Sequence, residues 1–168
     1  MLIGVLSDTH LAGKPVPESI MGALRGVDMI MHAGDILEMS VIEQLSTIAP
    51  TVAVRGNMDY GDVVRKFPER RVVDAQGFRI GLTHGYGPPL GMIRKVRRVF
   101  EGEELDAIVF GHTHEPLIKE KDGMLFFNPG SSTDKVFASV NTLGMLDITD
   151  KISPRIVNLC GLAREGDS

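Results

Sequence analysis

Short apolar runs recur along the chain, and most of them end in a polar turn that contains glycine. Runs of this length, rich in aliphatic and β-branched residues, are typical of buried strands. Strands are therefore predicted over 2–6, 27–31, 51–54, 71–75, 78–82, 106–110, 117–121, 124–127, 142–148 and 155–159. Gln76-Gly77 and Asp122-Gly123 fit tight hairpin turns between neighbouring strands.

Apolar residues at helical spacing predict three helices between these strands. The first begins at Pro17 and ends at Gly26. The second starts with Ser40-Val41-Ile42-Glu43, which has the spacing of a capping box, and ends at Pro50. The third covers 88–100. Up to residue 54 the order is strand, helix, strand, helix, strand, which indicates right-handed crossovers and a parallel sheet.

Size and composition indicate an ordinary globular protein. The 168 residues are 43% hydrophobic and 24% charged, so we expect one domain over 1–162 and a frayed tail over 163–168. A net charge of −4 gives no general attraction to nucleic acid or to an anionic membrane. Cys160 is the only cysteine, and the first apolar run has five residues, too few for a leader or a membrane span. A cytoplasmic protein without disulfides is expected.

Metal-binding side chains follow five of the predicted strands. They are Asp8, His10, Asp35, Asn57, His84, His112 and His114. Ligands of open α/β sheets collect beyond the carboxyl ends of the strands, so these side chains should converge. Seven ligands are too many for one tetrahedral ion, and they suit two ions about 3.5–4 Å apart that share a carboxylate.

The nature of the ligands narrows the choice of metal and substrate. Nitrogen and oxygen ligands without a thiolate suit Mn, Fe, Zn, Co or Ni better than Ca or Mg, and manganese is the first expectation. Two divalent ions and two carboxylates leave roughly two positive charges. A hydroxide and an anionic phosphoryl group would balance them, so the expected substrate is a phosphate ester.

The motifs resemble those of the calcineurin-like metallophosphoesterase superfamily, and the chain length is similar to its small prokaryotic phosphodiesterases. The matching segments are Asp8-Thr9-His10, Gly34-Asp35, Gly56-Asn57, His84-Gly85, Gly111-His112-Thr113-His114 and Asn128-Pro129-Gly130-Ser131. The resemblance implies an α/β fold, a two-sheet β-sandwich flanked by helices in four layers. It implies in-line attack on phosphorus by metal-bound hydroxide.

The resemblance also implies how the ligands are shared between two ions. One ion would be held by Asp8, His10, Asp35 and His114. The other would be held by Asp35, Asn57, His84 and His112, so that Asp35 is the bridge. Asn57, Asp59 and His84 are the residues expected to act in catalysis.

One position departs from the family pattern. Many members have a histidine after the asparagine, and it helps to protonate the leaving group, whereas this chain has Gly56-Asn57-Met58-Asp59. A thioether cannot donate a proton. The small prokaryotic subgroup often lacks this histidine, so the departure agrees with that placement. It predicts weak hydrolysis of esters with poor leaving groups.

Several residues near the motifs have two interpretations. His32 either supports Asp35 or is a structural histidine at a strand end, and the structural or supporting role is favoured. Asp59 is an acid, an orienting group or an exposed turn carboxylate. Arg55 either supports the phosphate or braces its loop. Residues 128–132 either give backbone N–H groups to phosphate or form a plain turn.

The expected partner is a small phosphodiester, a nucleotide included, and no membrane. Arg94, Lys95, Arg97 and Arg98 form a basic helix face, which is a solvated surface or a patch for a nucleotide or RNA backbone; nucleic acid is not favoured. The oligomeric state, a homo-oligomer included, stays open. The alternative function is a non-catalytic scaffold on the same fold, as in the retromer-coat subunit that resembles these enzymes. A scaffold would not need the full set of seven ligands.

Overall fold

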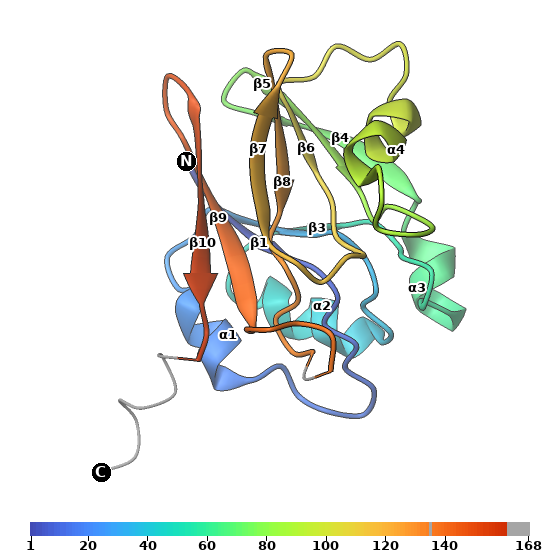
Figure 1. The fold of residues 1–168 in the computed structure, drawn as a ribbon. Helices are drawn as coiled ribbons and strands as arrows, with labels where there is room; N and C mark the ends of the chain where they lie inside the picture. Colours follow the sequence, from blue (N-terminus) through green and yellow to red (C-terminus); the bar gives the residue numbers. More distant parts are fainter. Residues whose placement is uncertain (135, 161–168) are drawn as a thin grey trace.

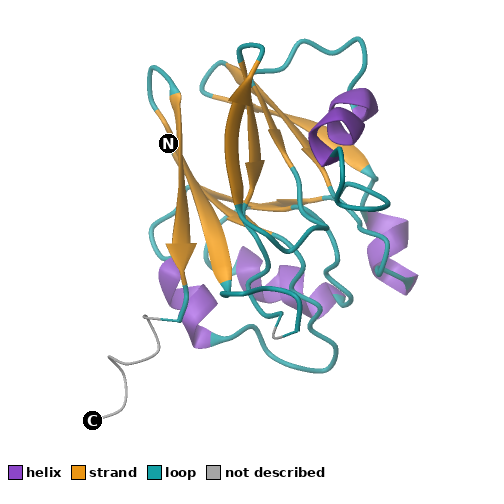
Figure 2. Ribbon diagram, in the orientation of Figure 1, coloured by secondary structure: helices purple, strands orange, loops and turns teal. Residues whose placement is uncertain are grey.

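The structure, a computed structural model, describes residues 1–134 and 136–160. Two mixed sheets of five strands each pack face to face, and short helices cover their outer faces (Figures 1 and 2). The two-sheet sandwich predicted from the sequence is confirmed. The boundary expected at residue 162 and the tail expected over 163–168 lie outside the described residues.

The first sheet has the strand order β10-β9-β1-β2-β3. Its strands are β1 (Leu2–Leu6), β2 (Met29–His32), β3 (Thr51–Ala53), β9 (Thr142–Ile148) and β10 (Ile152–Asn158). The first three run parallel, as the alternation of strands and helices predicts, while β9 pairs antiparallel with β1. The carboxyl ends of β1, β2 and β3 therefore lie at one edge of the sheet.

The second sheet has the order β4-β5-β6-β8-β7. Its strands are β4 (Arg70–Ala75), β5 (Phe78–Thr83), β6 (Ala107–Val109), β7 (Leu117–Lys121) and β8 (Met124–Asn128). Here β5, β6 and β8 run parallel, and two hairpins add β4 and β7. Both residues of each turn, Gln76-Gly77 and Asp122-Gly123, have positive φ, as type I′ hairpins require.

Four helices complete the layers: α1 (Glu18–Ala23), α2 (Met39–Ser46), α3 (Gly61–Lys66) and α4 (Met92–Val99). In Figure 1, α1 and α2 lie along the first sheet and α4 lies beside the second. Successive side chains of a strand point to opposite faces of the sheet, and this alternation produces the layers. In β6, for example, Ala107 and Val109 face the other sheet, whereas Ile108 packs in the cluster that contains Val96 of α4. None of the described helices is both long and apolar enough to cross a membrane.

The helices are shorter than predicted, and they differ from the predictions in other ways as well. The helix predicted over 88–100 begins only at Met92, because Gly91 has a left-handed φ of 73°. The capping box is wrong: α2 begins at Met39 after Glu38, without a side-chain cap, so Ser40 lies inside the helix. The short helix α3 was not predicted, since Val63 is its only buried residue and gives no apolar period.

Candidate metal centre

The candidate ligands lie in the loops that follow five strands, and these loops meet where the two sheets come together. Asp8 and His10 follow β1, and Asp35 follows β2. The other four are Asn57 after β3, His84 after β5, and His112 and His114 after β6. The Oδ2 atom of Asp8 accepts a hydrogen bond of 2.9 Å from the backbone N–H of His112, so a direct bond joins the loops of the two sheets.

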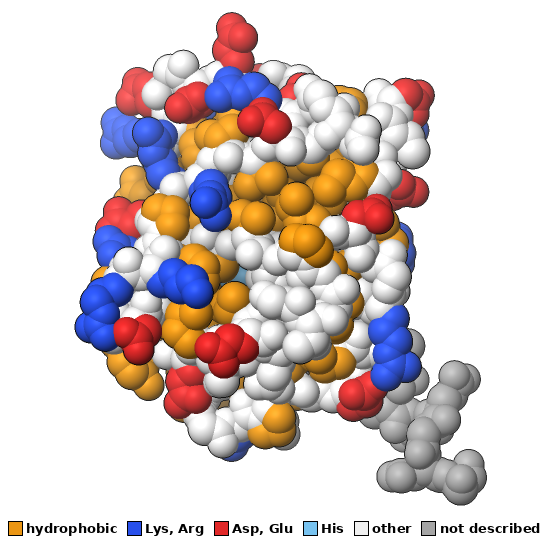
Figure 3. All heavy atoms as spheres, turned by 180° about the vertical axis from the view of Figure 1, so that it is seen from behind, with side chains coloured by type: hydrophobic (Ala, Val, Ile, Leu, Met, Phe, Trp, Pro, Cys, Tyr) orange, Lys and Arg blue, Asp and Glu red, His pale blue; other side chains and the backbone are white. Residues whose placement is uncertain are grey.

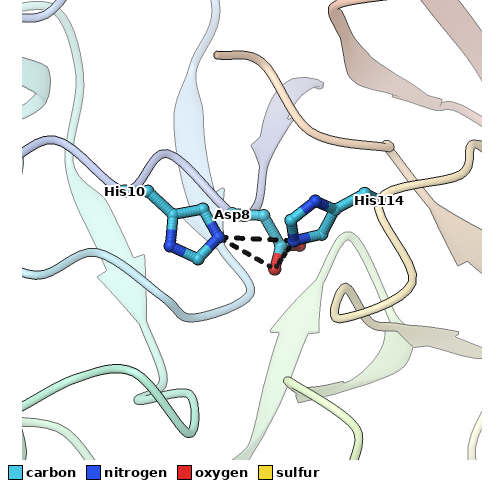
Figure 4. Close-up of side chains that lie close together, drawn as sticks. All are labelled: Asp8, His10 and His114. Carbon is cyan, nitrogen blue, oxygen red and sulfur yellow. Dashed lines mark hydrogen bonds and ion pairs between the residues drawn. The ribbon is translucent and has the colours of Figure 1, made fainter. Parts of the chain in front are cut away.

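Asp8, His10 and His114 form one compact cluster (Figure 4). His114 Nε2 lies 3.2 Å from Asp8 Oδ1 and 3.3 Å from His10 Nε2. His10 Nε2 lies 3.8 Å from Asp8 Oδ1 and 3.8 Å from Asp35 Oδ2. Three ligand atoms therefore face one small volume.

Asp8, Asp35 and His84 form a second cluster beside the first. His84 Nε2 lies 3.3 Å from Asp35 Oδ2 and 3.8 Å from Asp8 Oδ1. The ligand atoms of each cluster lie within 4.8 Å of one another. Both carboxylates thus occupy the middle of the site: Asp8 belongs to both clusters, and Asp35 Oδ2 faces His10 as well as His84.

Asn57 and His112 lie next to these clusters and contact each other. His112 Nδ1 is 3.0 Å from Asn57 Oδ1, and His112 Nε2 donates a hydrogen bond of 2.7 Å to the Gly87 carbonyl. The ring of His112 lies 5.2 Å from that of His84, centroid to centroid. Of the seven predicted ligands, the structure brings five into the two clusters and leaves Asn57 and His112 paired at their side.

Two ligand atoms in the clusters are buried without a hydrogen-bond partner among the described residues. They are Asp8 Oδ1 and His84 Nε2. A buried polar atom without a partner costs stability, and each such atom in a native fold calls for an explanation. Two buried carboxylates surrounded by imidazole nitrogens match the ligand preferences of a divalent transition metal. The residues present therefore fit such an ion.

His84 and His114 are each oriented by a hydrogen bond from the ring nitrogen Nδ1. His84 Nδ1 donates to the Ala33 carbonyl at 2.8 Å, and His114 Nδ1 donates to the carboxylate of Asp134. In a neutral ring this leaves Nε2 as the free lone pair, which is the form that binds metals. The sequence analysis missed Asp134, because it lies in a loop that no motif includes.

The buried carboxylates and imidazoles of the site shift the pKa values of one another. Burial alone raises the pKa of Asp8, but the contact with His114 and the charge of His84 outweigh it, and the pKa is lowered. Burial likewise raises the pKa of Asp35, and His84 brings it below its ordinary value. For His84, burial lowers the pKa, and the two carboxylates raise it above 6.5.

His114 and Asp134 also shift the pKa values of each other, at the edge of the site. The contact with Asp8 raises the pKa of His114 to about 9, against the effect of burial and with help from Asp134. Burial raises the pKa of Asp134, but the hydrogen bond from His114 dominates and lowers it to about 2. The buried carboxylates thus stabilise the protonated forms of His84 and His114.

The backbone of the site is strained. Asp8, His10, Asp35, His112 and His114 all have φ between 44° and 71°, the left-handed region that residues with a Cβ rarely adopt. Such conformations persist only where the surrounding structure enforces them, and they concentrate at functional sites. Five of the seven candidate ligands share this feature.

Two glycines allow the loops to come close enough. A Cβ on Gly56 would lie 2.2 Å from Asp35 Oδ1, and a Cβ on Gly111 would lie 1.7 Å from Ser7 Oγ and 2.6 Å from Asp8 Oδ2. Any side chain at these positions would push a candidate ligand away. The glycines after the predicted strands thus mark close approach to the two carboxylates.

Asp59 lies outside the ligand clusters and binds backbone. Its Oδ1 accepts hydrogen bonds of 2.7 Å from the N–H groups of Ile36 and Leu37. Its Oδ2 accepts bonds from Asp35 N–H at 3.0 Å and Gly56 N–H at 2.7 Å. Four backbone donors therefore fix this carboxylate between the β2 and β3 loops.

His32 and Arg55 also contact protein groups. Burial lowers the pKa of His32 to about 4, so its ring is neutral. It accepts a bond from Gly34 N–H at 3.2 Å and lies 3.2 Å from the Thr9 hydroxyl. Arg55 donates to the Val64 carbonyl and to Glu69. These contacts agree with a role for both residues in supporting the loops that carry the candidate ligands.

The segment 128–132 is buried and holds two ligand loops. Asn128 Nδ2 donates to the Gly111 carbonyl at 3.0 Å and the Thr113 hydroxyl at 2.9 Å. Ser131 Oγ donates to the Asp8 carbonyl at 2.7 Å. These contacts connect the loop after β8 to both halves of the site.

Comparison with known proteins agrees with this geometry. The family model of the calcineurin-like phosphoesterase superfamily domain matches residues 1–151. The chain is 42% identical over 139 residues to a probable metallophosphoesterase of Methanothermobacter thermautotrophicus, covering 79% of this chain and 78% of that protein.

Solved structures of the same fold cover nearly the whole chain. One, titled as a novel archaeal phosphodiesterase, is 25% identical with a TM-score of 0.74 and covers 94% of this chain and 99% of that one. Another, the zinc complex of Vps29 from Entamoeba histolytica, is 24% identical with a TM-score of 0.75, covering 95% and 99%, and shows the shared fold. With its family model, relatives and metal-ligand geometry, the chain belongs to the calcineurin-like phosphoesterase superfamily.

Proposed function

We propose that this protein is a phosphodiesterase that uses two divalent transition-metal ions, with manganese as the first candidate. The observation that carries the proposal is the pair of adjoining ligand clusters built around two buried carboxylates. Asp8, His10, Asp35 and His114 would hold one ion, and Asp35, Asn57, His84 and His112 the other. Such ions supply Lewis acidity, lower the pKa of water and neutralise phosphoryl charge.

The remaining residues position these groups. His84 has its Nδ1 fixed by Ala33, so its Nε2 stays aimed at both carboxylates. Asn57 and His112 line the cavity beside the two clusters, where they could contact a phosphoryl oxygen. Asp59 has both oxygens occupied by backbone N–H groups, and this favours the orienting role over that of an acid. His32 and Arg55 support the loops.

The test is metal content together with turnover of bis-p-nitrophenyl phosphate, followed by a phosphoester panel with Mn, Ni, Co, Zn and Mg. Diester hydrolysis that needs added metal supports the proposal. The Vps29 neighbours favour a second candidate, a scaffold that binds other proteins through the same fold. Metal-loaded protein without turnover under any of the five metals would support the scaffold.

Metal uptake should release protons. His114, with a pKa of about 9, is protonated at neutral pH when no metal is bound, and the carboxylates beside His84 raise its pKa in the same direction. Metals bind only the neutral ring, so affinity should rise with pH up to about 9. Calorimetric titration of manganese at pH 7 in two buffers of different ionisation heat should give roughly one or more protons released per protein. An affinity that does not change between pH 5 and 7.5 would contradict this.

Asp134→Asn should weaken metal binding at one of the two proposed sites. The carboxylate holds His114 in the tautomer that leaves Nε2 free, and losing such a partner costs typically 10–100-fold in affinity. Manganese stoichiometry at limiting metal should show one weakened site and one unchanged. Asp62→Asn is the control, because Asp62 is an exposed carboxylate paired with Arg65. Equal weakening of both sites would point to general damage to the fold.

A further inference from the structure

A cavity of about 780 Å³ opens in front of the candidate ligands. Its floor contains His10, Asp35, Asn57, His112 and His114. The rest of its lining, the wall, is mixed: Leu11, Met58, Pro89 and Phe137 supply apolar surface, and Thr9, Thr113, Thr133 and Asp134 supply polar groups. Lys14 is the one lysine or arginine among the lining residues that the structure describes. The cavity thus combines a phosphoryl-binding floor with a wall whose apolar part suits an uncharged group.

Phe137 is the most unusual part of this wall. The residue is 79% exposed, so its ring is largely open to solvent at the mouth of the cavity. Its ring centroid lies 6.2 Å from that of His114 with an interplanar angle of 70°, so the ring meets the histidine edge to face. Since most of its surface is accessible, the ring can stack against a second planar group.

The loop that carries Phe137 is tied to the candidate metal site. Asp134 Oδ2 accepts hydrogen bonds of 3.1 Å from the N–H groups of Phe137 and Ala138, and it also binds His114. Asn141 Nδ2 donates to the Asp134 carbonyl. The same carboxylate therefore sets the position of a candidate ligand and of the backbone of Phe137.

We propose that this cavity takes phosphodiesters with a planar aromatic arm, such as a nucleoside, and that Phe137 stacks on that arm. This inference rests on the proposed function and specifies its substrate class. An exposed ring beside a phosphoryl-binding floor fits an ester whose phosphorus lies at the ligands and whose ring lies against the wall. Among the described lining residues, only Lys14 carries a positive charge that could balance a highly charged arm.

Basic side chains gather at a different place, so they do not compete for this arm. Arg94, Lys95, Arg97 and Arg98 line a separate hollow of about 400 Å³ on α4. Seen from behind, lysine and arginine side chains lie along the side of the molecule where α3 and α4 are found in Figure 1 (Figure 3). The expected ligand is therefore the size of a mononucleotide ester, held by stacking rather than by an array of cations.

The test compares a planar ring with a puckered ring, at a pH where both phosphonates are fully ionised and carry the same charge. Phenylphosphonate and cyclohexylphosphonate have rings of the same size, and their P–C bonds are not hydrolysed. Calorimetric titration into the manganese-loaded protein should show phenylphosphonate binding about 2- to 10-fold more tightly. Phe137→Ala and Phe137→Leu should both remove this preference, because leucine restores apolar area but no ring.

Val136→Ala is the matched control. Val136 has the same exposure of 79% on the same loop, but it does not line the cavity. This variant should keep the native preference, and equal manganese content in all variants shows that the site is intact. Equal affinities for the two ligands in the native protein, no binding of either, or a preference retained in Phe137→Leu would overturn the proposal. The binding measurement does not depend on turnover. A protein that hydrolyses no diester would contradict the proposed function, and the ring preference could still be measured and interpreted.

Discussion

Asp35→Asn should empty both proposed metal sites. Asp35 Oδ2 lies 3.8 Å from His10 Nε2 and 3.3 Å from His84 Nε2, so one oxygen faces both clusters. Asparagine keeps the acceptor for the 2.8 Å bond from Met58 N–H but removes the bridging charge. Loss of a residue that only orients a metal ligand lowers metal affinity roughly 10–100-fold. Loss of the bridging carboxylate should lower the affinity of both sites by more than this, and diester hydrolysis should fall with it.

Asp8→Asn is the matched comparison, because Asp8 is the other buried carboxylate of the site. If Asp35 is the bridge, Asp8→Asn should chiefly empty one site, and metal analysis of the purified variants decides this. Asp8 Oδ1 nevertheless belongs to both clusters. The reverse result, two empty sites in Asp8→Asn and one in Asp35→Asn, would assign the bridge to Asp8.

Met58→His should flatten the dependence of rate on leaving-group pKa. The Met58 side chain is 54% exposed and lines the cavity, so an imidazole there could reach the leaving oxygen. General acid catalysis is worth typically 10²–10⁴-fold, and it matters when the leaving group is a strong base. The native protein should therefore favour activated aryl diesters, and monoesters should be poorer substrates. The gain in the variant should be largest for the most basic leaving groups.

Rates for a series of aryl diesters, native against Met58→His, measure this slope. Met58→Leu is the control, since leucine fills a similar volume without a donor. An unchanged slope in Met58→His would mean that chemistry is not rate-limiting or that a donor exists elsewhere. Asp59 and His32 are poor candidates, because backbone N–H groups occupy the first and complete burial isolates the second.

The features that the sequence predicted best are the strands and the polar residues that follow their ends. The bounds of β1 and β9 agree with the apolar runs, and parallel order alone places Asp8 and Asp35 at one edge. The meeting of the second-sheet loops with that edge depends on how the two sheets pack, and the apolar runs do not determine that packing. Asp134 was missed for the same reason: its bond to His114 spans 20 positions between irregular segments.

The chemistry of polar loops was harder to predict than their position. The Gly-Asn-Met-Asp segment gave Asp59 three interpretations, and its partners at 35–37 lie on a loop from another strand. Residues 128–132 had two interpretations. In the structure the segment is buried, and its side chains donate hydrogen bonds to the loops that carry Asp8 and His112. Hydrogen bonds between loops distant in sequence leave no periodic signal.

The candidate site joins loops of both sheets, and this has a consequence for how the molecule folds. His10 and His114 lie 104 positions apart, and Ser131 and Asp8, which brace the same loops, lie 123 apart. Contacts of such long range form late, after the cost of closing large loops has been met. A bound ion would then act mainly on a nearly complete fold: it would slow unfolding much more than it would speed folding. In the cell, metal supply would therefore set the lifetime of the folded protein rather than the rate at which it first forms.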